Sequence, residues 1–402
     1  MPEPLIDSLQ LMESNPGGDL DPKDVVGRDL FIEQLWERLE KQSVLLNAER
    51  RIGKTQVIKK MRSMPAAGWK PIYQNLEIVK TPAEFAELVY DEVQQHLGTK
   101  NRAINRVQHF LEENTAKYKD VELGLKERSW QELINAAMGD LLAARQEGKG
   151  RVVFFWDELP FMLQNILRGE QGIEQTNTLL SFIRSLSDKF PDLRVVLTGS
   201  IGIHHIINQL RKAKIPADPL NKFYATSLDP LSPAWGEALA HALVRGEKLK
   251  FPEINAAARA ISESVDHFPF YIHNVIARWK DEQRNGGAPE IRAFVQEQLV
   301  AAYDPWSLKH FRDRIYTYYP DAHEQQLAHK ILNTLALEGD DDDPPQAQSV
   351  EEIQNRIATD TDRQKLLAIL EKLENDHYLK RSPTGAYHFR FPLIRRWWRL
   401  HS

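Results

Sequence analysis

The segment LLNAERRIGKTQV, residues 45–57, decides the fold expected for this chain. It matches the spacing G-x-x-x-x-G-K-[S/T] of a phosphate-binding loop, except that Ala48 stands where the first glycine is usual. The apolar run SVLLNA precedes the loop and the helical pattern TQVIKKMRSM follows it, which places the loop between a strand and a helix. The amino terminus of a helix attracts anions through its free backbone N–H groups. The segment therefore predicts a nucleotide phosphate site in an α/β domain.

Each residue type in the loop suits one part of this chemistry. Backbone N–H groups from Arg50 to Thr55 would surround the β-phosphate, and Gly53 would let the backbone approach it closely. Lys54 would reach the β- and γ-phosphates, and the Thr55 hydroxyl would ligate Mg²⁺. The alternative is a G-K-T tripeptide that occurs by chance on a surface turn. The predicted nucleotide contacts in the loop are Ala48, Glu49, Arg50, Arg51, Ile52, Gly53, Lys54, Thr55 and Gln56.

A second motif, VVFFWDELP, is acidic and supplies the carboxylates that a phosphate loop needs for its metal ion. Asp157 would hold Mg²⁺, and Glu158 would orient or deprotonate the attacking water. The alternative is the solvated end of a strand, although adjacent carboxylates after five apolar residues are costly to bury without a purpose. The run VVLTGS ends in Thr198 and Ser200, and a hydroxyl there could contact the γ-phosphate or the water. A turn capped by hydroxyl groups explains Ser200 equally well.

The order of elements predicts a P-loop NTPase core built on a parallel sheet, with a helical lid and a C-terminal winged helix. Strand and helix patterns alternate through the first half, and continuous apolar runs such as RVVFFW are typical of strands buried on both faces of a parallel sheet. Later segments are amphipathic helices, and the last three are followed by the alternating strand GAYHFRF. The predicted parts are a flexible lead-in over 1–24, an ATPase core over 25–228, a lid over 229–315 and a winged helix over 316–402.

Composition limits the classes of protein that the chain can belong to. Its 402 residues are 42% hydrophobic and 27% charged, which is an ordinary globular balance. The absence of cysteine excludes disulfides, thiolate nucleophiles and cysteine-ligated zinc. The net charge of -5 gives no overall attraction to nucleic acid or to an anionic membrane. No basic and apolar leader opens the chain and no apolar run approaches about 20 residues, so we expect a cytoplasmic protein without a membrane partner.

Taken together, these motifs resemble the archaeal-type ATPases of the signal-transduction (STAND) branch of AAA-like P-loop NTPases. The resemblance spans nearly the whole chain, from residue 25 to residue 399. The phosphate loop and the acidic strand are specific to P-loop NTPases, whereas the other matches are persuasive mainly by their order. In that order they are VVGRDLFIEQLWERLE, ERRIGKT, FFWDELP, VVLTGS, PFYIHNVI, HFRDRIYTYY and YHFRFPLIRRWWR.

The resemblance implies roles for residues outside the two motifs. Val26 and Gly27 would lie near the adenine, and Pro269 matches a lid proline that approaches the nucleotide. His267 stands where the family's lid motif usually has glycine, and the place expected for a finger arginine after the sensor strand has Lys222, in PLNKFYAT, instead. Slow, switch-like ATP turnover therefore fits better than a ring-type ATPase. Oligomer formation on ATP binding is left open.

The C-terminal charges leave two kinds of partner open, DNA and protein. The helix at the recognition position has nearly balanced charges, whereas phosphate contact needs a positive excess. The strand and tail that follow are more basic, and could grip a DNA backbone or pack the tail onto the lid; their bases are Lys380, Arg381, Arg390, Arg395, Arg396 and Arg399. The leading hypothesis is a Mg²⁺-ATP-binding STAND-type ATPase that uses slow hydrolysis as a conformational switch. The alternatives are a nucleotide-dependent DNA-binding regulator and a protein-interaction scaffold with a weakly active site.

Overall fold

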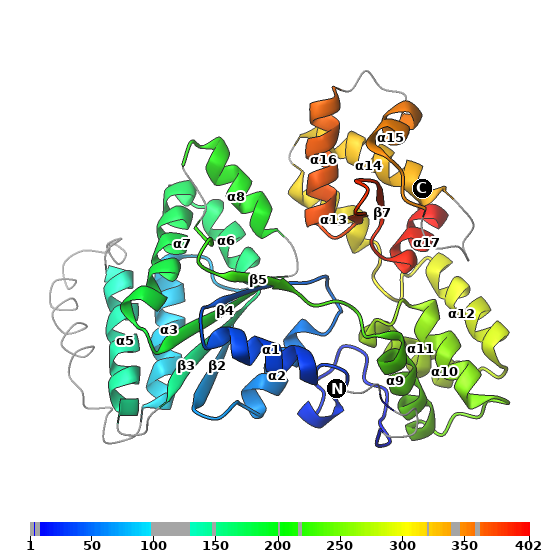
Figure 1. The fold of residues 1–402 in the computed structure, drawn as a ribbon, viewed down its shortest axis with the longest axis horizontal. Coiled ribbons are helices and arrows are strands. Elements are labelled where there is room, and N and C mark those ends of the chain that lie inside the picture. The colour runs from blue at the N-terminus through cyan, green and yellow to red at the C-terminus, as the bar shows by residue number, and fades with distance from the viewer. Residues whose placement is uncertain are drawn as a thin grey trace. The chain divides into compact units, whose positions relative to one another are not determined.

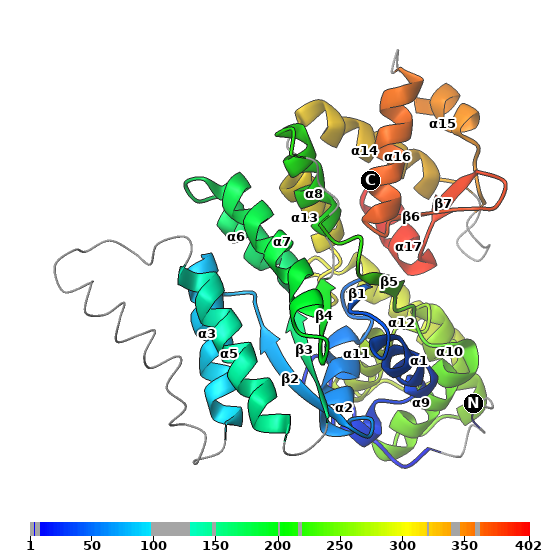
Figure 2. The same ribbon diagram turned by 60° about the vertical axis from the view of Figure 1, so that its left-hand side comes forward.

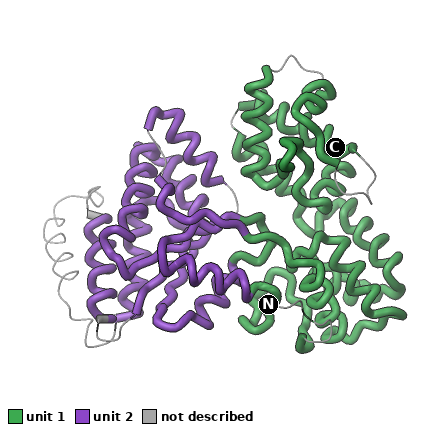
Figure 3. The backbone as a smooth tube through the Cα atoms, viewed as in Figure 1, with its two compact units in different colours: residues 1–28, 48–54, 228–402 green, residues 29–47, 55–227 purple. Residues whose placement is uncertain are grey.

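Figure 1 shows the chain in the computed structural model, which describes residues 4, 9–97, 129–146, 150–199, 202–215, 219–319, 321–338, 346–357 and 362–402, with only the backbone at 129 and 146. The chain divides into two compact units (Figure 3). Unit 1 comprises residues 1–28, 48–54 and 228–402, and unit 2 comprises residues 29–47 and 55–227. The two units are considered in turn.

Unit 2 contains a parallel sheet, as the sequence predicts, and this sheet has five strands. Its strands lie in the order β2 (Trp69–Asn75), β3 (Arg151–Asp157), β4 (Leu193–Gly199), β1 (Val44–Asn47) and β5 (Tyr224–Ser227). All adjacent pairs are parallel. The sequence analysis missed β5, because this four-residue strand alternates partly buried and exposed residues and contains no apolar run. The fold of this unit is that of an α/β P-loop NTPase.

Helices cover both faces of the sheet, which explains why its central strands are apolar throughout. These helices are α1 (Asp29–Leu39), α2 (Lys54–Ser63), α3 (Pro82–His96), α5 (Ser129–Gln146), α6 (Leu159–Leu167), α7 (Gly172–Lys189) and α8 (Ile203–Lys212). Phe154 and Trp156 point into the core formed with α3, α5, α6 and α7, whereas Phe155 contacts Trp36 of α1 on the opposite face. Helices α3 and α5 lie side by side in both views (Figures 1 and 2).

The start of α3 shows how local sequence sets a helix boundary. Thr81 Oγ1 accepts a hydrogen bond from the Glu84 N–H at 3.1 Å, and Pro82 occupies the first helical position. The Glu84 carboxylate in turn accepts from the Lys80 N–H at 2.7 Å, one residue before the cap. The Glu84 side chain thus bonds the backbone N–H of Lys80, whereas in a standard capping box it would bond that of the cap residue, Thr81. The corresponding side chain at the start of α5, Ser129, lies outside the described residues.

Unit 1 is mainly helical, in agreement with the helical patterns of the sequence. Its first helices are α9 (Pro233–Gly246), α10 (Ile254–Ser264), α11 (Pro269–Asp281), α12 (Ala288–Val300) and α13 (His310–Tyr318). Then follow α14 (Ala322–Ala336), α15 (Val350–Ile357), α16 (Arg363–Asn375), the antiparallel strands β6 (Leu379–Arg381) and β7 (Tyr387–Phe389), and α17 (Pro392–His401). The sequence analysis did not assign α17. Pro392 and the paired arginines are typical of a basic tail, and for this reason no helix was predicted there. The helix is amphipathic, and its buried residues include Trp397 and Trp398.

Within the lead-in predicted to be flexible over residues 1–24, the described residues 12–15 make contacts with the helices of unit 1. Met12 is 5% exposed, and its N–H donates to the Ala242 carbonyl of α9 at 3.4 Å. The Ser14 N–H donates to Glu247 Oε1 at 2.7 Å, and the Asn15 N–H donates to His273 Nδ1 at 3.1 Å. The polar composition of this segment suggested mobility, but its backbone N–H groups find acceptors on α11 and at the end of α9.

In the part of the chain that the structure describes, no helix combines the length and the apolarity that a membrane span requires.

Candidate functional site

The predicted phosphate loop occupies residues 48–53, between the end of β1 and the start of α2. Lys54 and Thr55 are therefore the first two residues of α2. Gly53 has φ +98°, and a Cβ added to it would meet no other atom within 4 Å. Arg51 also has positive φ, at 68°, which is costly for a side chain that is not glycine. The loop thus has a bent backbone and open space at Gly53, as the close approach of a phosphate requires.

In unit 2, three hydroxyl groups surround the Asp157 carboxylate. Thr55 Oγ1 donates to Asp157 Oδ2 at 3.0 Å, and the Tyr73 hydroxyl donates to the same oxygen at 3.2 Å. Thr198 Oγ1 donates to Asp157 Oδ1. Burial and then the nearby Asp157 charge raise the pKa of Tyr73, so its hydroxyl remains a donor. Mg²⁺ prefers oxygen ligands, and the Thr55 hydroxyl beside the Asp157 carboxylate is a set that fits it.

The sheet explains why these groups meet. Asp157 is the last residue of β3, and Thr198 is next to the last residue of β4, the neighbouring strand. Strand β1, which leads into the loop, pairs with the other edge of β4, with Leu46 opposite Thr198. The carboxyl ends of parallel strands lie at one edge of the sheet, which is where ligands bind in open α/β folds. Asp157 is 1% exposed, so its charge depends on these partners and on any bound cation.

Glu158, the predicted catalytic carboxylate, has an unusual backbone conformation. Its φ of 59° is in the left-handed region, and its N–H donates to Asp157 Oδ1 at 3.1 Å. It is the N-cap of α6, but its side chain makes no capping hydrogen bond to that helix. The cost of a left-handed glutamate is typical of functional sites, where strain directs a side chain.

In unit 1, a buried ion pair involves the second residue of the loop. Arg314 of α13 donates from one guanidinium nitrogen to Glu49 Oε1 at 2.9 Å and to Oε2 at 3.1 Å. Glu49 Oε1 also accepts from the Arg50 N–H at 2.7 Å. The sequence analysis had assigned the Arg50 N–H to phosphate. Here it donates to the preceding side chain, because a buried carboxylate needs donors.

Two more contacts hold the middle of the loop within unit 1. The Arg51 guanidinium carbon lies 4.4 Å from the centre of the Phe270 ring, next to Pro269. Arg28 donates to the Ile52 carbonyl at 2.9 Å and to the Asp229 carbonyl at 2.8 Å. Burial lowers the pKa of Arg28 to about 10, which leaves it charged at neutral pH. The loop is thus held by side chains that are distant in sequence.

The residues implied by the resemblance occupy turns and helix starts of unit 1. Gly27 has φ +68°, and an added Cβ would lie 2.8 Å from Cγ of Trp235, so no side chain fits there. Val26 precedes it and is partly exposed. Pro269 is the first residue of α11. His267 has φ +58°, in the left-handed region that favours glycine, and its Nδ1 lies 2.8 Å from Ser262 Oγ.

Other predicted residues lie apart from these contacts or outside the structure. Ser200 lies outside the described residues. Lys222, in the place of a finger arginine, makes an exposed ion pair with Asp188 at 2.5 Å within unit 2. The sequence analysis did not assign a role to Tyr73, Arg28 or Arg314. Little in the sequence indicated their roles, because Tyr73 lies in an ordinary strand pattern and both arginines belong to charged helical segments.

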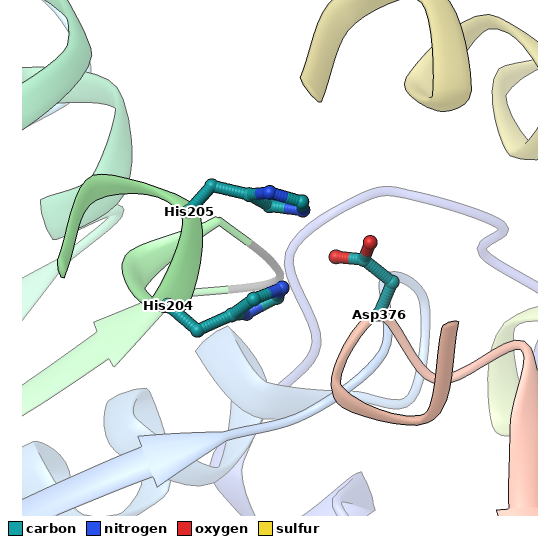
Figure 4. Close-up of side chains that lie close together, drawn as sticks. All are labelled: His204, His205 and Asp376. Carbon is teal, nitrogen blue, oxygen red and sulfur yellow. The ribbon is translucent and has the colours of Figure 1, made fainter. Parts of the chain in front are cut away.

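Figure 4 draws His204, His205 and Asp376. The two histidines are neighbours at the start of α8 in unit 2, with ring centroids 4.1 Å apart. Asp376 follows α16 in unit 1, where its carboxylate accepts from the Tyr319 hydroxyl at 2.8 Å. Because the three residues belong to different units, no metal site is assigned to them.

Comparisons with known proteins agree with the fold. The Walker-type ATPase of Pyrococcus abyssi aligns with a TM-score of 0.64 and 17% identity, over 96% of this chain and 100% of that chain. The ORC2 protein of Aeropyrum pernix, solved as ADPNP–ADP complexes, aligns with a TM-score of 0.51 and 12% identity, over 98% and 95%. Neither a scan against protein-family models nor a search of curated proteins found a match. These likenesses show that the chain has an α/β P-loop NTPase fold.

Proposed function

We propose that this protein binds Mg²⁺-ATP and hydrolyses it slowly, as a STAND-type conformational switch. The observation that carries the proposal is the Thr55 hydroxyl at 3.0 Å from the Asp157 carboxylate, directly after a loop with an open Gly53. A hydroxyl at the start of a helix and a buried acid at the end of a strand are the two metal-facing groups of P-loop NTPases. The nucleotide complexes of the Aeropyrum pernix ORC2 protein, which has a similar fold, support the same conclusion.

The loop residues would bind the phosphates. Lys54 would supply a positive charge to the β- and γ-phosphates, and backbone N–H groups from Arg51 to Thr55 would add donors at the start of α2. The remaining loop contacts, from Ala48 to Gln56, and the adenine and lid contacts Val26, Gly27 and Pro269 belong to the same proposal. Ala48 is 1% exposed, so its methyl group fits within the protein interior.

Thr55 and Asp157 would hold Mg²⁺. Bound there, the ion would neutralise charge that develops on the phosphate oxygens. Tyr73 and Thr198 would fix the orientation of the Asp157 carboxylate through their hydrogen bonds. Glu158 would orient the attacking water and take its proton, and Ser200 is a further candidate for contact with that water. We propose slow turnover because the place expected for a finger arginine has Lys222 instead. Lys222 forms an ion pair with Asp188.

The rest of the chain would change conformation with the nucleotide. We propose the divisions expected from the sequence, with an ATPase core over 25–228, a lid over 229–315 and a winged helix over 316–402. Helices α14, α15 and α16 followed by the β6–β7 hairpin are consistent with a winged helix. A protein partner, and oligomer formation on ATP binding, belong to this proposal.

The contacts of the tail arginines favour packing over DNA binding. Arg395 is 2% exposed and donates to the Glu338 carbonyl at 2.5 Å, and Arg396 donates to the Ser264 carbonyl. Arg390 donates to Asp229 Oδ1 at 2.7 Å. Arginines used in this way offer little positive charge to a phosphate backbone. We therefore propose a protein partner ahead of DNA.

ATP binding by the Lys54→Ala variant tests the proposal. We expect its affinity for Mg²⁺-ATP to fall about tenfold or more, because a charge-assisted hydrogen bond is worth about 1.5–3 kcal/mol. The matched control is Lys189→Ala, at the exposed end of α7. Isothermal titration with and without Mg²⁺ gives both affinities. Equal affinity in Lys54→Ala and wild type would overturn the proposal.

A further inference from the structure

A buried ion pair between Glu49 and Arg314 connects the phosphate loop to α13 within unit 1. The Glu49 side chain is fully buried and that of Arg314 is 7% exposed. Glu49 is the second residue of the phosphate loop, and Arg314 lies 265 positions later, on α13. Both belong to unit 1. The loop is thus joined to a helix near the C-terminal part of the chain by a largely buried charge pair.

Arg314 is itself firmly held. Its guanidinium carbon lies 4.4 Å from the centre of the Phe311 ring and 4.7 Å from that of Tyr378. Its Nε donates to the Tyr378 hydroxyl at 3.4 Å, and this hydroxyl donates to the Phe311 carbonyl. Burial works against the charged form of Arg314, but Glu49, Tyr378 and Asp376 together outweigh burial and raise the pKa of the guanidinium. Arg314 therefore stays charged, and its position depends on α13 and on Tyr378, next to β6.

Glu49 is a problem for a loop that has to receive phosphates. A carboxylate near the phosphates of a bound nucleotide repels them, unless its charge is neutralised or turned away. Here the carboxylate is turned into unit 1, where it accepts from Arg314 and from the Arg50 N–H. Removing one partner of a buried ion pair leaves an uncompensated charge. Without Arg314, Glu49 would have to leave its buried position and the loop would change shape.

We propose that Arg314 is a positioning residue for the phosphate loop: it neutralises Glu49 and keeps residues 48–53 in the conformation that receives phosphate. A movement of α13 then releases the loop and lowers nucleotide affinity. By thermodynamic linkage, nucleotide in the loop holds α13 in place to the same extent. The C-terminal part of the chain thus controls the site. The expected effect on nucleotide affinity rests on the proposed function. The restraint of the loop by Arg314 rests on the ion pair alone.

A double-mutant cycle with Arg314→Gln, Glu49→Gln and the combined variant tests this inference. The first measurement is hydrogen exchange of the amides of residues 49–54 in nucleotide-free protein. We expect exchange about tenfold faster or more in Arg314→Gln, which leaves the Glu49 carboxylate unpaired in the loop, and within about threefold of wild type in the combined variant, which has no charge at either position. Glu49→Gln leaves Arg314 unpaired on α13 and not in the loop, so we expect its exchange to lie between these two. The second measurement is the affinity for Mg²⁺-ATP, with the same pattern expected. The matched control is Arg292→Gln, whose side chain on α12 is 56% exposed.

Each outcome decides a separate point. Unchanged exchange in Arg314→Gln would overturn the inference, and so would a combined variant as fast as Arg314→Gln, because the arginine would then matter only for packing. If Arg314→Gln does not fold, Arg314→Lys takes its place: it keeps the charge that neutralises Glu49, so we expect exchange within about threefold of wild type, and exchange about tenfold faster would contradict the inference. If wild type binds no ATP, the proposed function fails, while the exchange of the nucleotide-free loop still decides whether Arg314 restrains it.

Discussion

At the scale of single residues, the Asp157 carboxylate is the group on which most side chains of the candidate site converge. Its two oxygens accept from Thr55, Tyr73 and Thr198, which come from α2, β2 and β4. A metal ligand oriented by several hydroxyl groups is pre-organised, and the loss of an orienting partner usually costs 10–100-fold in metal affinity or activity. Since Asp157 is the proposed Mg²⁺ ligand, we expect different effects from substitution of Asp157 and from substitution of the hydroxyl groups that orient it.

Tyr73→Phe is a test of such a support. We expect a decrease of about tenfold in ATP turnover at limiting Mg²⁺ and a smaller decrease at saturating Mg²⁺, because only the orientation of Asp157 is affected. Steady-state turnover across a Mg²⁺ titration measures this. Tyr224→Phe on β5 serves as the matched control. A loss in Tyr73→Phe that Mg²⁺ does not relieve would contradict the supporting role.

His267 gives a prediction about backbone conformation. With φ +58°, it occupies a conformation that glycine adopts freely and other L-residues adopt at a cost of about 1–2 kcal/mol. Both His267→Gly and His267→Ala lose the contact with Ser262 Oγ, but only the alanine keeps the conformational cost. We expect His267→Gly to be about 1 kcal/mol more stable than His267→Ala in urea unfolding. Equal stability would mean that the backbone relaxes in the alanine variant.

Much of the residue-scale site could be predicted, because the loop and the acidic strand end have characteristic spacings. Lys54, Thr55, Asp157 and Glu158 follow directly from GKT and WDE. The partner of Glu49 could not be predicted, since Arg314 is 265 positions away and nothing in its local pattern indicates a buried charge. Long-range polar pairs are decided by tertiary structure, which local periodicity does not report.

At the scale of elements, residues 12–15 contact α9 and α11, and His273 on α11 is one of their partners. This histidine is 4% exposed, accepts from the Asn15 N–H at 3.1 Å, and has a pKa that burial lowers to about 4. The unfolded chain then binds more protons than the folded one between about pH 6.5 and 4. The stabilising effect of neutral His273 is thus present above pH 6.5 and is lost as the pH falls through this window.

The comparison of wild type with His273→Gln isolates this effect from other groups, including Asp266, whose pKa burial raises to about 6 and which acts in the opposite direction. We expect the difference in unfolding free energy between the two proteins to change by up to about 3 kcal/mol in favour of His273→Gln between pH 7 and pH 4. Urea unfolding at several pH values measures it. A pH-independent difference would show that His273 is not held in its neutral form.

Helix α17 gives a prediction that separates packing from DNA contact. Because Arg395 is 2% exposed and bonded to the Glu338 carbonyl, we expect Arg395→Ala to lower the unfolding free energy by about 2–3 kcal/mol. Lys380→Ala, on the exposed part of β6, should change it by less than about 0.5 kcal/mol. Thermal and urea unfolding provide these values. A stable Arg395→Ala variant that loses salt-dependent DNA binding would instead favour the DNA-binding alternative.

The elements themselves were predicted unevenly, for identifiable reasons. Strands β3 and β4 are long apolar runs and were found, whereas β5 has only four residues and pairs through its backbone. Helix α17 was missed because Pro392 and the basic residues that follow resemble a loop or tail. In the structure that proline is the first residue of the helix, where its missing N–H costs nothing.

At the scale of the whole molecule, the central claim is that nucleotide changes the conformation of residues 228–402. The phosphate loop is grouped with this part of the chain in unit 1, and Glu49 and Arg51 contact it. Arg28 also donates to both the Ile52 and the Asp229 carbonyls. A ligand shifts a conformational equilibrium only as far as it binds the two states differently. The γ-phosphate has to provide that difference, so ATP-bound and ADP-bound protein should differ.

Hydrogen exchange of residues 228–402 in Glu158→Gln tests this most directly, because this variant should bind ATP but hydrolyse it about 10²–10⁴-fold more slowly than wild type. The account predicts that, with saturating Mg²⁺-ATP, the amides of α11 and α13 exchange more slowly than in the same variant with Mg²⁺-ADP, and that Lys54→Ala shows no such difference. Identical exchange of these helices with ATP, with ADP and without nucleotide would contradict the account.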